Sequence, residues 1–348
     1  MERYLEFKIK EQTAPVKIDT FLKKHAGLTK RQISQAKFRP DGITRNGIRC
    51  RVTETAYPGD VLRICLEEAQ TASLHLESFS GSAAHPLLDI LYEDEDLLAV
   101  NKPAGMVTHP TGHHYADSLT NLAASYFHQQ NLLVRIRPVG RLDQETSGIV
   151  IFAKNQAAAS RLQSVKSPSK IHKTYLAAVS GCLPVDSHSN LLSGTVESAG
   201  FLSAETFEEP FWHTVRQPLM QDPANHLKMK TAACLSSQLF SGKIKTAVTH
   251  YHTIFSSPNW ALIALRLETG RTHQIRVHMA SVGHPLLGDL LYNSVSETDT
   301  VPSFSRTALH AWKVSFRHPF RPEYISLEAP LPEDFRQLRQ EASLPFLR

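Results

Sequence analysis

The sequence predicts an α+β fold that is divided into two unequal parts. Candidate strands and helices do not alternate regularly, which favours a mixed or antiparallel sheet over a doubly wound parallel sheet. The 348 residues exceed what one ordinary core holds. Residues 1–66 carry 14 Lys+Arg and 7 Asp+Glu, whereas residues 67–100 carry no Lys or Arg. We therefore expect a small basic α+β domain at 1–68, a linker at 69–86 and a larger domain at 87–348.

The composition excludes several classes of protein. With 41% hydrophobic and 20% charged residues, the chain belongs neither to the disordered nor to the low-complexity class. No apolar stretch approaches the roughly 20 residues that span a bilayer, and the N-terminus lacks the apolar core of a signal peptide. The four cysteines lie far apart without CxxC spacing, which indicates free thiols in a reducing compartment (Cys50, Cys65, Cys182 and Cys234). We expect a monomeric, cytoplasmic protein with no membrane partner.

Two short helices followed by hairpin strands are expected in residues 1–66. Apolar residues follow helical spacing from Ile18 to Ala26, and Thr29 is a candidate N-cap for a second helix. Lys30 and Arg31 lie off the apolar stripe of that second helix, where they could contact phosphate. Turns are expected at two positions (Asn46-Gly47 and Pro58-Gly59-Asp60).

The charge of this basic unit alone leaves a solvated surface as an alternative to a nucleic-acid site. The order of its features resembles the alpha-L RNA-binding motif, which stands at the N-terminus of many RNA-modifying enzymes. The resemblance covers residues 16–66, with the two turns in matching positions. It implies that residues 1–68 bind RNA.

The larger part is expected to be mixed in secondary structure. Helices are predicted at 155–165 and 273–281, and residues 184–230 show no clear periodicity, so we expect an insertion or a long loop there. Strands are predicted where β-branched, aromatic or long apolar residues gather (88–92, 97–101, 148–153, 175–179, 246–254 and 260–267).

The polar segment 140–148 is the first candidate for chemistry. It precedes a strand of buried type, and a loop that leads into a core strand holds polar groups at the edge of a cleft. Asp143 is the main candidate there, although an ordinary polar turn stabilised by its carboxylate is an open alternative. Asp143 and Glu145 could also form the carboxylate pair of a glycosidase, but such enzymes usually take their two acids from separate elements.

Three further segments carry polar residues with ordinary alternatives. Arg271 and Arg276 are five residues apart, so one regular helix cannot direct both into a single site, and a basic amphipathic helix is the alternative. Tyr175 opens an apolar strand and could be simple core. Lys102 stands beside a rigid turn and is either a surface corner or a phosphate contact. A metal site is not expected, since no carboxylate or thiolate is spaced to complete a shell with the loop histidines (His109, His113 and His114).

Together these segments resemble the RluA-type pseudouridine synthases, which isomerise uridine in ribosomal or transfer RNA. The resemblance implies that Asp143 is the catalytic aspartate, that Tyr175 stacks on the target base and that Arg276 pairs with Asp143. Arg141 would fill the space that the flipped base leaves, whereas Gly140 departs from the histidine of many members. The matching segments occur in the family's order: Asn-Lys-Pro-Ala-Gly-Met (101–106), Arg-Leu-Asp-Gln-Glu-Thr-Ser-Gly (141–148), Lys-Thr-Tyr-Leu-Ala (173–177), Thr-Gly-Arg-Thr-His-Gln-Ile-Arg-Val-His (269–278), Gly-His-Pro-Leu-Leu-Gly-Asp (283–289) and Leu-His-Ala (309–311).

The implied reaction breaks the C1′–N1 bond of a flipped uridine and joins C1′ to C5. No cofactor and no metal are expected, because the reaction involves neither redox change nor hydrolysis. Asp143 could attack C1′ or remove a sugar proton, and the sequence does not choose between these routes. A non-catalytic RNA-binding or ribosome assembly factor on the same fold is the alternative function. RNA contacts are expected from a further set of residues (Lys30, Arg31, Lys102, Arg271, His273 and Gln274).

Overall fold

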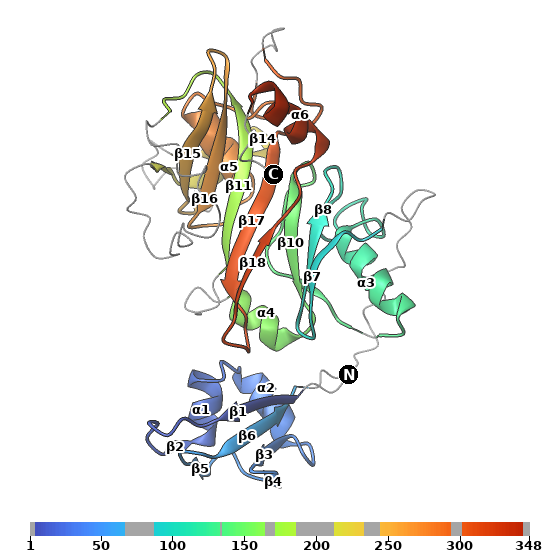
Figure 1. Ribbon diagram of the computed structural model, residues 1–348, viewed down its shortest axis with the longest axis vertical. Coiled ribbons are helices and arrows are strands. Elements are labelled where there is room, and N and C mark those ends of the chain that lie inside the picture. Colours follow the sequence, from blue (N-terminus) through green and yellow to red (C-terminus); the bar gives the residue numbers. More distant parts are fainter. Residues whose placement is uncertain are drawn as a thin grey trace.

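The computed structural model describes residues 4–66, 87–132, 134–163, 171–185, 212–232, 244–293 and 301–343. These residues form a small four-stranded sheet and a large ten-stranded sheet, each with its own helices (Figure 1). The α+β class that the sequence predicts is confirmed. Within the described ranges, no helix is long and apolar enough to cross a membrane.

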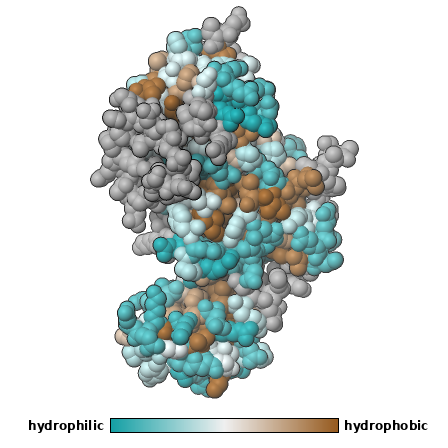
Figure 2. Space-filling view, in the orientation of Figure 1, coloured by the Kyte–Doolittle hydropathy of each residue, from teal (hydrophilic) through white to brown (hydrophobic). Residues whose placement is uncertain are grey.

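In the N-terminal part, two short helices pack against the small sheet. Helix α1 spans Ile18–Lys24 and α2 spans Lys30–Lys37, and Thr29 caps α2 as expected, through reciprocal hydrogen bonds with Gln32. Figure 2 shows mostly hydrophilic residues on the visible face of this part. The strands follow the order β1–β6–β3–β4 (Tyr4–Lys8, Val61–Cys65, Ile43–Arg45, Ile48–Arg49), and β2 pairs separately with β5 (Val16–Lys17, Thr55–Ala56).

The large sheet has the order β12–β15–β16–β11–β17–β10–β8–β7, with β18 beside β17 and β9 beside β10. Strand β17 lies between β10 and β11, and its His310 is opposite Ser147 of β10 and Leu176 of β11. This register brings the start of β10 close to the middle of β11. The strands are β7 (Ile90–Glu93), β8 (Leu97–Lys102), β9 (Arg137–Pro138), β10 (Ser147–Ala153), β11 (His172–Ser180), β12 (His213–Arg216), β15 (Val248–Ser256), β16 (Trp260–Leu267), β17 (Leu309–Arg317) and β18 (Tyr324–Glu328).

Helices cover both faces of the large sheet. Because side chains alternate along a strand, Val150 and Phe152 of β10 pack in one core with Phe127, whereas Ile149 and Ile151 pack in another. Helices α3 and α5 pack on the face of the first core, and helices α4 and α6 pack on the opposite face. The helices are α3 (Leu119–Gln129), α4 (Gln156–Gln163), α5 (Gln274–Ser281) and α6 (Glu333–Glu341).

The predicted elements of the larger part differ from the structure mainly at their ends. The strand expected at 88–92 is β7, the helix expected at 155–165 is the shorter α4, and the helix expected at 273–281 begins one residue later. Helices α3 and α6 and strands β17 and β18 were not predicted. The expected linker lies outside the described residues, as does 186–211 of the expected insertion. The rest of the expected insertion contains β12 and a hairpin of β13 (Leu219–Asp222) and β14 (Asn225–Thr231).

Arg161 of α4 joins the two parts. Its guanidinium donates hydrogen bonds to the carbonyl oxygens of Ala26 in the N-terminal part and Pro319 in the larger part, and it stacks 4.8 Å from the ring centroid of Phe320. Phe320 and Ala157 also belong to the apolar cluster of the N-terminal part. The connection between α1 and α2 therefore packs against α4 and the loop that follows β17.

Candidate active site

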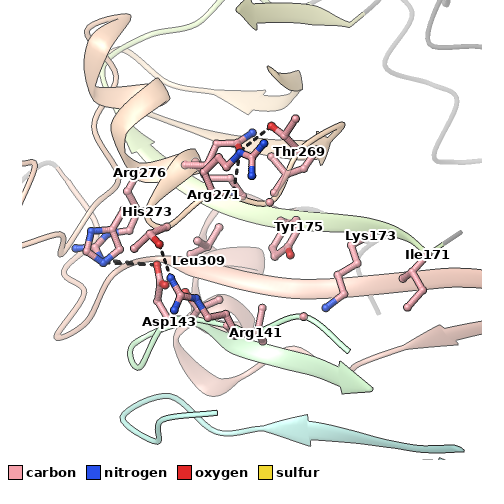
Figure 3. A pocket seen from close by; sticks show the side chains of 18 of the residues that line it. Arg141, Asp143, Ile171, Lys173, Tyr175, Thr269, Arg271, His273, Arg276 and Leu309 are labelled. Carbon is pink, nitrogen blue, oxygen red and sulfur yellow. Dashed lines mark hydrogen bonds and ion pairs between the residues drawn. The ribbon is translucent and has the colours of Figure 1, made fainter. Parts of the chain in front are cut away.

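A pocket of about 450 Å³ lies where the loop before β10, the first half of β11 and the start of α5 meet (Figure 3). Asp143, Tyr175 and Arg276 all line this pocket, although they are far apart in the sequence. The segments that carry the sequence motifs therefore converge on one cavity.

Contacts to a second loop fix the backbone of Asp143. The Thr108 hydroxyl donates to the carbonyl of Leu142 at 2.8 Å and lies 3.1 Å from the Leu142 N–H, which donates to it. The N–H of Gly105 donates to the carbonyl of Gln144 at 2.9 Å. Residues on both sides of Asp143 are thus held, which leaves its carboxylate as the free end of a rigid loop.

Gly148 allows the close approach of β10 to β17. Its φ is +108°, and a Cβ at this position would lie 2.2 Å from the carbonyl oxygen of Ala311. Only glycine fits such a contact without displacing a strand. Since Ala311 is also opposite Tyr175, this contact sets the spacing between the Asp143 loop and the tyrosine.

Lys102 occupies a different place from the one expected. Its side chain is fully buried, and its ammonium donates to the carbonyls of Pro103 (2.8 Å), Met106 (2.6 Å) and Gln144 (2.9 Å). Burial lowers the pKa of this amine to about 7, whereas its three carbonyl partners favour the ammonium form. The expected RNA contact of Lys102 is therefore wrong, because its amine is directed into the protein, where it joins the two loops.

The carboxylate of Asp143 faces two basic side chains. Nη1 of Arg276 lies 3.9 Å from Oδ2 of Asp143, and Nε2 of His273 lies 4.0 Å from the same oxygen. The Asp143 side chain is 23% exposed, so it remains open to the pocket. A carboxylate in this position can attack an electrophilic carbon or accept a proton.

Asp289 holds Arg276 in place. Its carboxylate accepts hydrogen bonds of 2.7 Å from both Nε and Nη2 of Arg276, and it also accepts the N–H groups of Leu291 and Tyr292. Arg276 therefore pairs with Asp289 more closely than with Asp143, its expected partner. Asp289 is the last residue of the motif segment 283–289, and its contact with Arg276 is not predicted by the sequence.

His273 lies just before α5 in a left-handed conformation with φ of 55°. Its Nδ1 is 2.9 Å from the hydroxyl of Tyr292. Burial lowers the pKa of His273, while the nearby Asp143 opposes that shift. The shift favours the neutral imidazole, and the ring forms part of the pocket wall beside Asp143.

The start of α5 explains how two arginines reach one pocket. Arg271 precedes the helix and donates to the carbonyl of Thr246 at 3.1 Å, so the limit set by a regular helix does not apply to it. Gln274 is only 2% exposed, and its side-chain amide bonds to Val248, Thr249, Thr269 and the N–H of Arg271. The expected RNA contact of Gln274 does not fit this arrangement, in which the side chain fixes the loop before α5.

Tyr175 forms the floor of the pocket and belongs to the main core, with 7% of its surface exposed. Burial, with Asp143 nearby, raises the pKa of Tyr175, so its phenol stays neutral. A neutral aromatic face in a pocket is suited to stacking on a flat base.

The remaining predicted residues lie at the pocket mouth or away from it. Arg141 is exposed and donates a hydrogen bond to the hydroxyl of Thr272. Lys30 and Arg31 are exposed at the start of α2, in the N-terminal part. Lys30 and Arg31 could contact a ligand only if the ligand extends beyond the pocket.

Among the described residues, one group has the geometry to hold a metal ion: Asp94, His318 and Glu323. The guanidinium of Arg321 bonds to both Asp94 and Glu323, so these carboxylates already have a cation. The group does not line the pocket.

Comparison with known proteins gives consistent matches. A sequence profile of the RNA pseudouridylate synthase family matches residues 96–281. The uncharacterized RNA pseudouridine synthase YlyB of Bacillus subtilis is 32% identical over 331 residues, covering 94% of each chain. The ribosomal large subunit pseudouridine synthase D of Zymomonas mobilis is 36% identical over 261 residues, covering 72% of this chain and 71% of its own.

A solved structure shares the fold over most of this chain. The human RNA pseudouridylate synthase domain containing 4 superposes with a TM-score of 0.52 at 21% identity, covering 73% of this chain and 93% of its own.

Proposed function

The chain belongs to the RNA pseudouridylate synthase family, and we propose that it isomerises specific uridines of ribosomal or transfer RNA through Asp143. The resemblance to the RluA-type members is confirmed by the relatives, and the protein is an enzyme that forms pseudouridine in RNA. We further propose that the RNA is ribosomal or transfer RNA, and we assign roles to individual residues of the pocket.

One observation carries the proposal for the site. The partly exposed carboxylate of Asp143 lies in a pocket with Arg276 at 3.9 Å and with the buried ring of Tyr175 among the same lining residues. A uridine flipped into this pocket would stack on Tyr175 and present its C1′ to Asp143. Arg276 would keep a positive charge beside the carboxylate during the reaction.

The reaction is an internal rearrangement. The C1′–N1 bond breaks, the detached uracil turns and C1′ joins to C5. The proton on C5 leaves to solvent and N1 takes up a proton, so the product is an isomer of uridine. Asp143 either bonds transiently to C1′ or removes a proton from the sugar, and both routes need its ionised form. Arg141 at the mouth would occupy the gap in the RNA stack, which offsets part of the cost of flipping.

The RNA would also contact the N-terminal part. Its exposed Lys30 and Arg31 support a phosphate-binding role for residues 1–68, and the name of the Zymomonas mobilis relative supports ribosomal RNA as the substrate. We propose a monomer that acts in the cytoplasm, where such RNA is found. A glycosidase is less well supported, since Glu145 is not among the residues that line the pocket.

The test is tritium release from RNA labelled at uridine C5. The wild-type protein should release tritium from bulk ribosomal or transfer RNA, and Asp143→Asn should release none. Release by both proteins would remove Asp143 from the chemistry. Tight RNA binding without release from any substrate would favour the non-catalytic RNA-binding alternative.

A further inference from the structure

Lys173 lies in the active-site pocket at a distance from Asp143. It is on β11, two residues before Tyr175, and both side chains line the cavity. Figure 3 shows Lys173 and Ile171 on one side of Tyr175, with Asp143, His273 and Arg276 on the other. Asp143 and its two basic neighbours therefore lie at one end of the pocket, Tyr175 lies at the centre, and Lys173 lies at the other end.

The ammonium of Lys173 has no partner among the described residues, whereas the arginines of the pocket are all engaged. Arg276 bonds to Asp289, Arg141 to Thr272 and Arg271 to Thr246. No hydrogen bond or ion pair within the described part of the chain involves the Lys173 side chain. Its charge is consequently available to a ligand.

Gly140 keeps the space beside this amine open. A Cβ at position 140 would lie 4.0 Å from Nζ of Lys173, so any larger side chain there could extend toward the ammonium. The glycine has a φ of +82° and leaves that space empty of side-chain atoms. The amine thus faces the pocket without a neighbouring group at this position.

An unpaired ammonium in a partly buried pocket is unfavourable unless a ligand supplies the counter-charge. Burial without a carboxylate lowers the pKa of Lys173 to about 8. Uracil and ribose are neutral, and the anionic group of RNA is the phosphodiester. Phosphate is therefore the ligand group that an amine in this position would recognise.

We propose that Lys173 binds a backbone phosphate next to the flipped uridine, at the end of the pocket away from Asp143. This inference rests on the proposed function. The contact would hold the flipped nucleotide by its backbone while Tyr175 holds its base. The amine would act on binding and position, and would take no part in the bond changes at C1′.

The experiment compares Lys173→Met and Lys173→Arg with the wild type, using a C5-tritiated ribosomal RNA transcript. Lys313→Met is the matched control, because it removes the same charge from the neighbouring β17, where the ammonium pairs with Glu328 at 3.2 Å. Lys173→Met should raise KM about tenfold with kcat nearly unchanged. It should also reduce the slope of log affinity against log salt by about 0.7 to 0.9, as expected for one lost phosphate contact. Lys173→Arg should keep most of the affinity.

The pH dependence gives an independent readout. Since Lys173 must be protonated to bind phosphate, the wild-type KM should rise above about pH 8, the value to which burial lowers the pKa of Lys173. The KM of Lys173→Arg should stay constant to pH 9. The KM of Lys173→Met should be higher than that of the wild type at neutral pH and should not rise further above pH 8. The charged or titratable side chains on the surrounding elements are unchanged in both variants (Arg141, His172, Tyr175, Arg266, Glu268 and Lys313).

Two results would overturn the inference. An unchanged KM and salt slope in Lys173→Met would exclude the phosphate contact, and a loss of kcat at constant KM would place Lys173 in the chemistry instead. The Kd of the same RNA, measured by fluorescence anisotropy, tests the contact even without turnover. A wild-type protein that releases no tritium but whose Kd still depends on Lys173 would therefore contradict the proposed function and not the phosphate contact.

Discussion

The carboxylate of Asp289 binds the guanidinium of Arg276 through two hydrogen bonds of 2.7 Å. The remaining nitrogen, Nη1, points to Asp143 at 3.9 Å. Asp289 is itself fully buried and held by two backbone N–H groups, so the pair is fixed before any ligand arrives. Asp289 is thus a positioning residue that acts through Arg276.

Asp289→Asn should lower kcat about 100-fold with a smaller change in KM, because Arg276 loses the partner that directs it to Asp143. It should also lower the free energy of unfolding by about 3 kcal/mol, since a buried guanidinium loses its counter-charge. Tritium release and urea unfolding measure the two effects. The control Glu93→Gln weakens the Lys154–Glu93 pair away from the pocket and should keep kcat. An unchanged kcat in Asp289→Asn would contradict the positioning role.

Lys102→Met should lower the free energy of unfolding by about 3 kcal/mol, because buried carbonyls would lose a charged donor. The Kd for RNA should not change, because the amine is fully buried. Urea unfolding and fluorescence anisotropy test the two statements. Lys24→Met removes an exposed amine and should change stability by less than about 0.5 kcal/mol. A weakened Kd with unchanged stability would restore the RNA contact expected from the sequence.

Gly148→Ala should destabilise the protein by about 3 kcal/mol or more, because its Cβ would overlap the backbone of Ala311 and displace a strand. Gly47→Ala is a matched comparison, since Gly47 also has positive φ but nothing within 4 Å of an added Cβ. Gly47→Ala should lower the free energy of unfolding by only about 1 kcal/mol, from backbone strain alone. Equal losses in thermal unfolding experiments would rule out the overlap as the cause.

Stability should fall in mild acid because of His310. Its ring is fully buried, its Nδ1 lies 2.9 Å from the Ser147 hydroxyl, and burial lowers its pKa to about 4. The unfolded chain binds a proton near pH 6.5 and the folded chain only near pH 4, so this contribution is complete above pH 6.5 and lost toward pH 4. The loss should be about 3 kcal/mol. Urea unfolding of the wild type and of His310→Gln at pH 6.5 and at pH 4 measures this loss. If the free energy of unfolding falls equally in both proteins, His310 is not the cause.

Replacing Lys30 and Arg31 together by alanine should weaken RNA binding and reduce the salt slope by about 0.7 to 0.9 for each lost phosphate contact. The double variant Arg336→Ala with Arg339→Ala removes the same charge from α6 and should leave the slope unchanged. Anisotropy titrations over a salt series provide the measurement. If the first double variant keeps the wild-type slope, the basic N-terminal surface does not bind RNA phosphate.

Local patterns were sufficient to predict some of the elements, including the strand that follows the Asp143 loop. Thr29 and the spacing from Ile18 to Ala26 predicted both N-terminal helices, and the apolar run at 148–153 predicted β10. Helix α3 was missed although Ser118 caps it, because its buried residues include polar Thr120 and Asn121, which interrupt the apolar pattern. Strand β17 was missed although Lys313 and Ser315 alternate with apolar residues, which is a pattern typical of a strand.

The motifs predicted which residues gather in the pocket, but not how each side chain is used. Lys102 and Gln274 are polar residues within motifs, and nothing local distinguishes a polar side chain that faces solvent from one that satisfies buried backbone groups. The partner of Arg276 depends on a contact with a residue 13 positions away, which spacing on one helix cannot reveal. Such choices follow from tertiary packing.

The contacts of Arg161 affect how the two parts would share one RNA molecule. Two binding surfaces on a flexible tether sample many separations, and tether length then sets the effective concentration of one near the other. Arg161 instead bonds directly to Ala26 and Pro319, which favours one separation. An RNA held by both surfaces must present its phosphates and its target uridine at a matching distance. RNAs of another shape lose the gain in avidity, so uridine selection would depend on RNA architecture as well as on the bases beside the target.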